Sequence, residues 1–209
     1  MTRIKCCGMT RVEDAVLAAR LGADAIGLVF TARSKRRVTL AQARAIVAAL
    51  PPFVHTVGLF MDDDAALVEE VVAAVQPDWL QFHGGETDAW CARFGRRFIK
   101  AVAMGEGAAA LPRLRAYPHA SALLLDGHGL GEAGGSGQAF DWSLVPRELD
   151  RPWVLAGGLD ADNVAAAIRI SRPWAVDVAS GIEASPGIKD AAKMERFIAA
   201  VRQASTVHT

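Results

Sequence analysis

Two side chains that can transfer a proton stand at the ends of short apolar runs. Cys7 ends a run that begins at Arg3 and is followed by Gly8, and Asp126 follows three leucines. A thiol at a strand end beside a helix N-terminus has a lowered pKa, which suits a base or a nucleophile. A carboxyl in a water-poor position has a raised pKa, which suits a general acid. The ordinary alternatives are a small core residue for Cys7 and a cap or turn residue for Asp126.

Glycine and serine recur in segments that can bind an anion. Six glycines lie between residues 127 and 137, a Gly-Gly pair ends at Gly158, and Ser180 is followed by Gly181. Glycines by themselves also permit a merely flexible surface connection. Backbone N–H groups after the last two strands of an α/β barrel, together with a helix N-terminus, bind phosphate. The two later positions therefore favour a phosphorylated substrate.

The remaining charged candidates each have two interpretations. The basic run from Arg33 to Arg37 is typical of a solvated face, but an arginine in it can also bind a carboxylate bidentately. His83 is either structural or part of a site. Asp177 lies among apolar residues, where an unpaired charge is costly, so it needs a partner and is expected to be structural, or to support a site residue, rather than to act as an acid. No pair of histidine or carboxylate residues has metal-ligand spacing, so no metal site is predicted.

Eight apolar runs with strand character alternate with stretches of helical spacing. Their ends lie 20 to 30 residues apart, which fits one strand plus one helix and is too long for a hairpin. The runs are apolar almost throughout, as in a parallel sheet covered on both faces. The predicted strands are residues 3–7, 25–30, 56–60, 79–82, 98–102, 122–126, 153–156 and 175–179.

Eight such units indicate either a closed (β/α)8 barrel or a doubly wound open sheet. A dinucleotide-binding open sheet carries a glycine-rich turn after its first strand, and here that turn holds only Gly8. The 209 residues are near the compact end of the range for barrels. We therefore predict a single (β/α)8 TIM barrel over residues 1–209, with its active site at the carboxyl ends of the strands.

Capping residues mark the expected helix boundaries. Thr10 and Glu13 form a predicted capping box for a helix that ends at Gly22, and Thr39 with Gln42 forms another. The remaining expectations are caps at Asp62 to Asp64, a cap at Asp160 or Asp162, and a last helix over residues 191–203.

Composition excludes several classes of protein. Twenty-three basic and twenty-three acidic residues leave no net charge to favour nucleic acid or an anionic membrane. Three cysteines are too few for a disulfide framework and indicate free thiols in a reducing compartment. No apolar run is long enough to span a membrane, and the N-terminus lacks the apolar core of a signal peptide. A cytoplasmic protein is expected.

Several short motifs lie in the same order as those of a known family. They are Lys5-Cys-Cys-Gly-Met-Thr10, Gly22-Ala-Asp-Ala-Ile-Gly-Leu-Val-Phe30, Ser34-Lys-Arg-Arg-Val38, Gln81-Phe-His-Gly84, Gly134-Gly-Ser-Gly-Gln-Ala-Phe-Asp-Trp142, Leu155-Ala-Gly-Gly-Leu159 and Val176-Asp-Val-Ala-Ser-Gly-Ile-Glu183. With them the chain resembles phosphoribosylanthranilate isomerase of tryptophan biosynthesis, a family of single (β/α)8 barrels. The chain departs from the family pattern at Cys6, Lys35 and Gln138, where an aliphatic residue, a proline and a basic residue are usual.

The resemblance implies an Amadori rearrangement of N-(5-phosphoribosyl)anthranilate to 1-(2-carboxyphenylamino)-1-deoxyribulose 5-phosphate. By family position, Cys7 is the general base, Asp126 is the general acid, and Arg36 faces the anthranilate carboxylate. His83 is a further candidate for substrate binding. The residues expected around the phosphate are Gly135, Gly158, Ser180 and Gly181.

No redox cofactor or metal is expected, because the substrate's own nitrogen serves as the electron sink. Two other classes stay open. A metal-dependent pentose-phosphate epimerase would need paired histidine and carboxylate ligands at strand ends, and a regulatory barrel without catalysis would not need both Cys7 and Asp126. The expected partner is a small phosphorylated substrate, with neither nucleic acid nor membrane, and the chain is expected to be a monomer or a homodimer.

Overall fold

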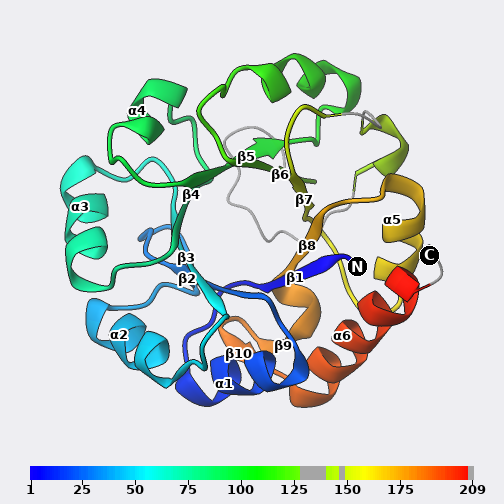
Figure 1. The fold of residues 1–209 in the computed structure, drawn as a ribbon, viewed down its shortest axis with the longest axis horizontal. Helices are drawn as coiled ribbons and strands as arrows, with labels where there is room; N and C mark the ends of the chain where they lie inside the picture. The colour runs from blue at the N-terminus through cyan, green and yellow to red at the C-terminus, as the bar shows by residue number, and fades with distance from the viewer. Residues whose placement is uncertain (128–139, 146–148, 207–209) are drawn as a thin grey trace.

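A closed barrel of eight parallel strands forms the centre of the protein. The computed structural model describes residues 1–127, 140–145 and 149–206. Each strand pairs with its neighbour in the sequence, and β8 pairs with β1 to close the barrel (Figure 1). The strands are β1 (Arg3–Cys6), β2 (Ala25–Val29), β3 (His55–Phe60), β4 (Trp79–Phe82), β5 (Phe98–Ala103), β6 (Ala122–Asp126), β7 (Trp153–Leu155) and β8 (Ala175–Val178). This topology confirms the predicted TIM barrel and excludes the open sheet.

A ring of helices surrounds the barrel (Figure 1). Between β5 and β6 the predicted helical stretch is a 3-10 segment that contains Pro112. Proline has no N–H to donate and clashes with the preceding turn, so a regular α-helix is interrupted there. The helical elements are α1 (Val12–Leu21), α2 (Leu40–Ala49), α3 (Ala65–Ala74), α4 (Asp88–Ala92), η1 (Gly107–Arg115), η2 (Trp142–Leu144), α5 (Val164–Ser171) and α6 (Ala191–Thr206).

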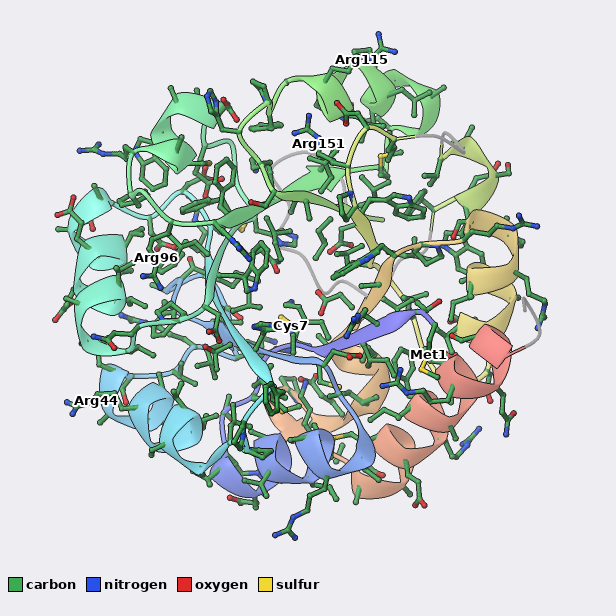
Figure 2. The ribbon with its side chains drawn as sticks, in the orientation of Figure 1. Met1, Cys7, Arg44, Arg96, Arg115 and Arg151 are labelled. Atoms are coloured by element: carbon green, nitrogen blue, oxygen red, sulfur yellow. The ribbon has the colours of Figure 1, made fainter. Side chains whose placement is uncertain are left out.

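Side chains alternate between the inside of the barrel and the layer under the helices. Leu124 belongs to the core within the barrel, whereas Ile26 packs in the core outside it. Cys6 lies in that outer core, while Cys7 clusters with Leu59 at the mouth of the barrel. Figure 2 shows Cys7 within the ring of strands. The two adjacent cysteines thus point to opposite faces of the barrel wall, as strand alternation requires.

The helix-cap predictions are correct where the contacts are local. Thr39 and Gln42 form the predicted box at the start of α2, with Thr39 Oγ1 accepting from Gln42 N at 3.2 Å. Asp64 caps α3 by accepting from Leu67 N at 2.8 Å. Gly22 ends α1 with a φ of 104°, a left-handed conformation that glycine adopts without strain.

Two cap predictions are wrong. The Thr10 hydroxyl donates to the carbonyl of Gly187 instead of forming a capping box, and α1 begins without a side-chain cap. At α5 the N-cap is Asn163 rather than Asp160 or Asp162. The carboxylate of Asp160 accepts from the backbone N–H groups of Asp162 and Asn163, at 2.9 and 3.0 Å, so it stabilises the turn before the helix.

A small hairpin after β8, absent from the sequence prediction, brings the chain back to the barrel mouth. Strands β9 (Glu183–Ser185) and β10 (Ile188–Lys189) pair antiparallel after the short turn η3 (Ser180–Ile182). From β10, Lys189 Nζ donates to the carbonyl of Cys7 at 2.7 Å. The hairpin thereby places charged side chains next to the end of β1.

The observed strands end close to their predicted bounds. Strands β4 and β6 span the predicted residues, while β1, β2, β7 and β8 each end one residue earlier than expected. The residue just beyond each of these four strands therefore opens a loop at the barrel mouth. Among the described helices, none has the length and apolar character needed to cross a membrane.

Candidate active site

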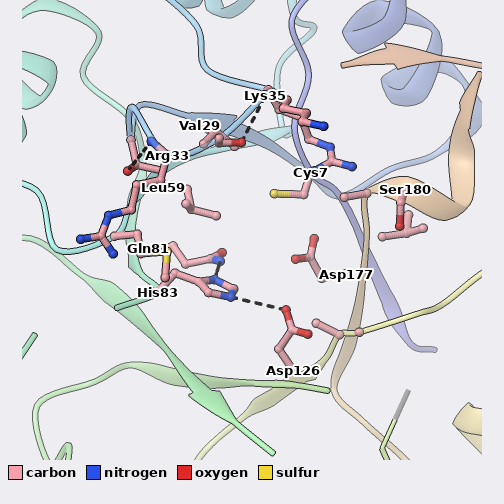
Figure 3. Close-up of a pocket in the computed structure, with 18 of the residues that line it drawn as sticks. Cys7, Val29, Arg33, Lys35, Leu59, Gln81, His83, Asp126, Asp177 and Ser180 are labelled. Atoms are coloured by element: carbon pink, nitrogen blue, oxygen red, sulfur yellow. Dashed lines mark hydrogen bonds and ion pairs between the residues drawn. The ribbon is translucent and has the colours of Figure 1, made fainter. Parts of the chain in front are cut away.

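A cavity of about 240 Å³ opens at the carboxyl ends of the barrel strands (Figure 3). The predicted site residues that line it are Cys7, Arg36, His83, Asp126, Gly158 and Ser180. Gly181 adjoins Ser180 without being part of the lining, and Gly135 lies outside the described residues. One cavity thus contains both candidates for proton transfer.

Cys7 is held in place by the backbone around it. Its N–H donates to the carbonyl of Val178 at 2.8 Å, and its own carbonyl accepts from Lys189 Nζ. Figure 3 shows its sulfur directed into the cavity. Gly27 on β2 leaves room for this sulfur, since a Cβ at that position would lie 2.7 Å from Sγ. A larger residue at position 27 would therefore displace the thiol.

The electrostatic surroundings of the thiol differ from the expectation. Burial raises the pKa of Cys7, the ammonium group of Lys5 lowers it, and the carboxylate of Asp177 raises it. The resulting pKa lies above the usual value of a cysteine, so the predicted lowering is wrong for the unliganded protein. The reason is burial: Cys7 is 6% exposed, and α1 begins only at Val12.

A buried ion pair connects β1 to β8 close to the thiol. Lys5 Nζ lies 2.9 Å from Asp177 Oδ1, and the two residues are direct partners in the β1–β8 register. Burial lowers the pKa of Lys5, but the charges of Asp177 and Cys7 and the hydrogen bonds to them together outweigh burial and raise the pKa above its usual value. The expectation that Asp177 needs a partner is confirmed. Its carboxylate also lines the cavity.

Asp126 lies against His83 inside the same cavity. His83 Nε2 is 3.4 Å from Asp126 Oδ2, and His83 Nδ1 is 3.2 Å from Gln81 Nε2 (Figure 3). All three side chains are buried. The backbone N–H of His83 donates to the carbonyl of Phe60 at 2.9 Å. Lys100 Nζ donates to the backbone carbonyls of the residues before and after His83, Phe82 and Gly84, at 3.2 and 2.6 Å. His83 is thus a fixed neighbour of the candidate acid, and its role in substrate binding stays a prediction.

Arg36 lies across the cavity mouth and is already paired on one edge. Its Nε and Nη2 donate to the two carboxylate oxygens of Glu183, both at 2.8 Å. Gly8 makes room for it, because a Cβ there would lie 2.5 Å from Arg36 Cδ. Burial raises the pKa of Glu183, but the hydrogen bond from Arg36 and the charge of Lys189 outweigh it and lower the pKa. Two of the five guanidinium N–H groups donate to Glu183.

The rest of the basic run is solvated. Arg37 is exposed, and the exposed Arg33 forms a long ion pair with Asp62 at 3.4 Å. Arg33 and Arg37 therefore fit the interpretation as a solvated face, while Arg36 is held inward by the buried Glu183. The binding of a substrate carboxylate by Arg36 stays a prediction.

Glycines shape the part of the cavity between the loops after β7 and β8. Gly157 and Gly158 have φ values of 87° and 63°, which other residues rarely adopt, and both line the cavity. The carbonyl of Gly158 accepts from Asn163 Nδ2 at 2.7 Å, so the loop is tied to the start of α5. Gly181 packs against the Leu159 carbonyl so closely that a Cβ would not fit. These contacts place backbone N–H groups beside a helix N-terminus.

Several residues of the site were not predicted as such. Lys5 stands two positions before Cys7, and strand alternation could have placed both on the inner face. Gln81 stands two positions before His83 in the same way. The contacts of Glu183 and Lys189 depend on the unpredicted hairpin.

Within the described residues, no group of three histidine, cysteine, aspartate or glutamate side chains is arranged to hold a metal ion.

Comparisons with known proteins agree with this geometry. Residues 4–200 match the family model described as PRAI, N-(5'phosphoribosyl)anthranilate (PRA) isomerase. The chain is similar to two proteins named N-(5'-phosphoribosyl)anthranilate isomerase. It is 53% identical to the one from Stutzerimonas stutzeri and 54% identical to the one from Pseudomonas fluorescens. These matches cover 97% and 96% of this chain and 98% of each relative.

Solved structures show the same likeness. The phosphoribosyl anthranilate isomerase of Thermotoga maritima is 40% identical with a TM-score of 0.90, covering 97% of this chain and 100% of that one. A phosphoribosyl anthranilate isomerase in complex with reduced 1-(o-carboxyphenylamino)-1-deoxyribulose 5-phosphate is 38% identical with a TM-score of 0.87, over the same shares. The match over nearly the whole chain, on a barrel with this cavity, shows that the chain belongs to the N-(5'-phosphoribosyl)anthranilate isomerase family.

Proposed function

We propose that Cys7 and Asp126 perform the proton transfers of phosphoribosylanthranilate isomerisation, the activity of the family to which the chain belongs. The observation that carries this proposal is that a buried thiol and a buried carboxyl line the same cavity at the carboxyl ends of the strands. Residues at this end of a TIM barrel form its active site. The reaction needs one acid and one base, and the cavity supplies a group suited to each.

The first step opens the furanose ring. Asp126 in its protonated form donates to the ring oxygen, the C1′–O bond breaks, and the nitrogen lone pair forms a protonated imine. His83 lies 3.4 Å from the carboxyl and keeps it directed into the cavity. The carboxyl is left as a carboxylate, which can accept a proton again at the end of the cycle.

The second step moves a proton from carbon. The protonated imine makes the hydrogen on C2′ acidic, the Cys7 thiolate removes it, and the electron pair of the C–H bond forms an enolamine. Tautomerisation of the enolamine then gives the ketone. C1′ is reduced and C2′ is oxidised within one molecule, so the atoms and electrons balance without an external oxidant.

Substrate binding is assigned to the rim of the cavity. The edge of the Arg36 guanidinium that faces away from Glu183 suits the anthranilate carboxylate, while Glu183 holds the other edge. The backbone around Gly158, Ser180 and Gly181 suits the phosphate. The related structure holds reduced 1-(o-carboxyphenylamino)-1-deoxyribulose 5-phosphate, a ligand with one carboxylate and one phosphate, which supports this assignment.

The experiment that tests this function uses purified protein and phosphoribosylanthranilate formed in the assay. The wild type should consume the fluorescent anthranilate adduct in a buffer containing a metal chelator. Cys7→Ala should be inactive although folded, as judged by circular dichroism. A wild type that leaves the adduct unchanged, or a folded Cys7→Ala variant that turns it over normally, would overturn the proposal.

We further propose that the enzyme acts in the cytoplasm. The three cysteines are free and buried in the structure, which suits a reducing compartment. A Thermotoga maritima relative is described as a dimer, and the expectation of a monomer or homodimer for this chain is tested by light scattering.

A further inference from the structure

The Lys5–Asp177 pair contributes a buried charge to the base side of the cavity. Lys5 lies on β1, and Cys7 directly follows the last residue of that strand, so the two side chains, two positions apart, point to the inside of the barrel. Lys5 is 4% exposed, and its Nζ lies 2.9 Å from Asp177 Oδ1. Asp177 and Cys7 both line the cavity, while Lys5 lies one layer below them. The ammonium group is thus fixed beneath the thiol by a carboxylate on the neighbouring strand.

Four charged side chains surround the thiol from the elements packed against it. Lys5 comes from β1, Asp177 from β8, Lys189 from β10 and Arg36 from the loop after β2. Across the cavity stand the titratable groups of His83 and Asp126.

Two of the cations already have other partners at short distance. Arg36 donates twice to Glu183, and Lys189 donates to Glu183 at 2.9 Å and to two backbone carbonyls. Lys5 is paired with Asp177 at 2.9 Å. Even so, its ammonium group lowers the pKa of Cys7 more than that of Lys189 does.

A buried thiol needs such a charge in order to act as a base. Burial raises the pKa of Cys7, and among the charged groups the ammonium of Lys5 opposes this most strongly. Coulomb attraction is strong where water is excluded, so an ammonium group inside a barrel favours the thiolate far more than one on the surface. Lys5 itself holds its proton tightly, because the charge of Asp177 raises its pKa. It therefore acts as a fixed charge and not as an acid.

We propose that Lys5 is a positioning residue that stabilises the thiolate form of Cys7, the form that acts as the base, and that Asp177 holds Lys5 in place for this purpose. The inference rests on the proposed role of Cys7 and goes beyond it by naming the group that makes the thiol ionisable. The proton that Cys7 takes from C2′ passes to the enolamine in the tautomerisation, and Lys5 keeps its own proton throughout.

The test measures the ionisation of Cys7 directly. In a Cys6→Ala background, the rate of alkylation of Cys7 by iodoacetamide is followed against pH by peptide mass spectrometry. Lys5→Met should raise the midpoint of this profile by about one pH unit or more, which is about a tenfold loss of thiolate below the midpoint. The acid limb of the kcat profile should move by the same amount. Lys5→Arg, which keeps the charge, should restore most of both.

A matched control removes a different buried lysine. Lys100 on β5 is 1% exposed and pairs with Glu86 at 3.3 Å, on the opposite side of the barrel. Lys100→Met should therefore leave the alkylation midpoint of Cys7 unchanged. If Lys5→Met does not fold, the double variant Lys5→Met/Asp177→Asn leaves no charge of the pair unpaired, and its midpoint should lie above that of Asp177→Asn alone.

The outcomes separate the inference from the function on which it rests. An unchanged midpoint and an unchanged acid limb in folded Lys5→Met, or an equal shift in Lys100→Met, would overturn the role of Lys5 while leaving the isomerase activity intact. A wild type without isomerase activity, or an active Cys7→Ala variant, would instead overturn the proposed function.

Discussion

The contact between Glu183 and Arg36 allows a quantitative prediction. It should contribute to the free energy of unfolding, and it also orients the arginine that is proposed to bind the substrate. In Glu183→Gln the side chain keeps its shape and loses its charge. Glu183 Oε1 accepts from Arg36 Nε at 2.8 Å, from Lys189 Nζ at 2.9 Å and from the backbone N–H of Gly187 at 3.1 Å, while Oε2 accepts from Arg36 Nη2 at 2.8 Å. A glutamine oxygen in the place of Oε1 can keep the first three bonds, but the amide nitrogen cannot accept from Nη2. One charge-assisted bond is lost and the other three no longer end on a charge, which together gives a loss of about 3 kcal/mol in the free energy of unfolding.

The assay is thermal unfolding followed by circular dichroism, together with urea titration. For a chain of this size a loss of about 3 kcal/mol corresponds to a fall in Tm of roughly 6–12 °C. The KM of the variant should also rise, because Arg36 is no longer held in one orientation.

The control is a more exposed arginine–glutamate pair, joined by one hydrogen bond of the same length. Arg113 Nη1 lies 2.8 Å from Glu106 Oε2, with side chains 27% and 43% exposed. Surface pairs contribute about 0–1 kcal/mol, so Glu106→Gln should change stability little. If Glu183→Gln were no more destabilising than Glu106→Gln, the buried pair would not hold the hairpin to the barrel mouth, and the reasoning would be refuted.

Three further predictions concern pH, the base and the carboxylate contact. Because Glu183 has a lowered pKa in the folded protein, its stabilisation is present above the unfolded pKa of about 4.3 and is lost as pH falls through the folded value. Unfolding curves of the wild type and Glu183→Gln should therefore converge on acidification, and a constant gap would contradict this. Cys7→Ser should nearly abolish turnover while Cys6→Ala keeps most of it, and equal losses in folded protein would show that strand alternation does not decide which thiol reacts. Arg36→Met should raise KM while Arg37→Met does little, since Arg37 is exposed; an unchanged KM and rate in Arg36→Met would remove Arg36 from the site.

The fold could be predicted because its determinants are local and repeated. Apolar strands at regular intervals lead to a parallel barrel, and local caps such as Thr39 mark helix starts correctly. The errors arise where a distant contact takes over a local one. The Thr10 hydroxyl bonds to Gly187, 177 residues away, instead of capping α1. No local pattern around Thr10 carries that information.

The site could be predicted only in part for the same reason. Cys7 and Asp126 follow apolar strands, so their position at the barrel mouth follows from the order of the elements. The partners of the site residues come from closure of the barrel: Lys5 meets Asp177 across 172 residues, and Arg36 meets Glu183 across 147. Burial, which raises the pKa of Cys7, is likewise a property of the assembled barrel.

The measurement that tests the central claim most directly is the rate of Asp126→Asn set beside its affinity for the reduced product analogue. Asparagine keeps the shape of the side chain and cannot transfer the proton, so kcat should fall by at least roughly 10²–10⁴-fold, the contribution of general acid catalysis. The Kd of the analogue should change much less, because the contacts assigned to Arg36 and to the loops at Gly158 and Ser180 are untouched. A variant that binds the analogue poorly and yet turns over normally at saturating substrate would make Asp126 a binding residue and contradict the acid–base account.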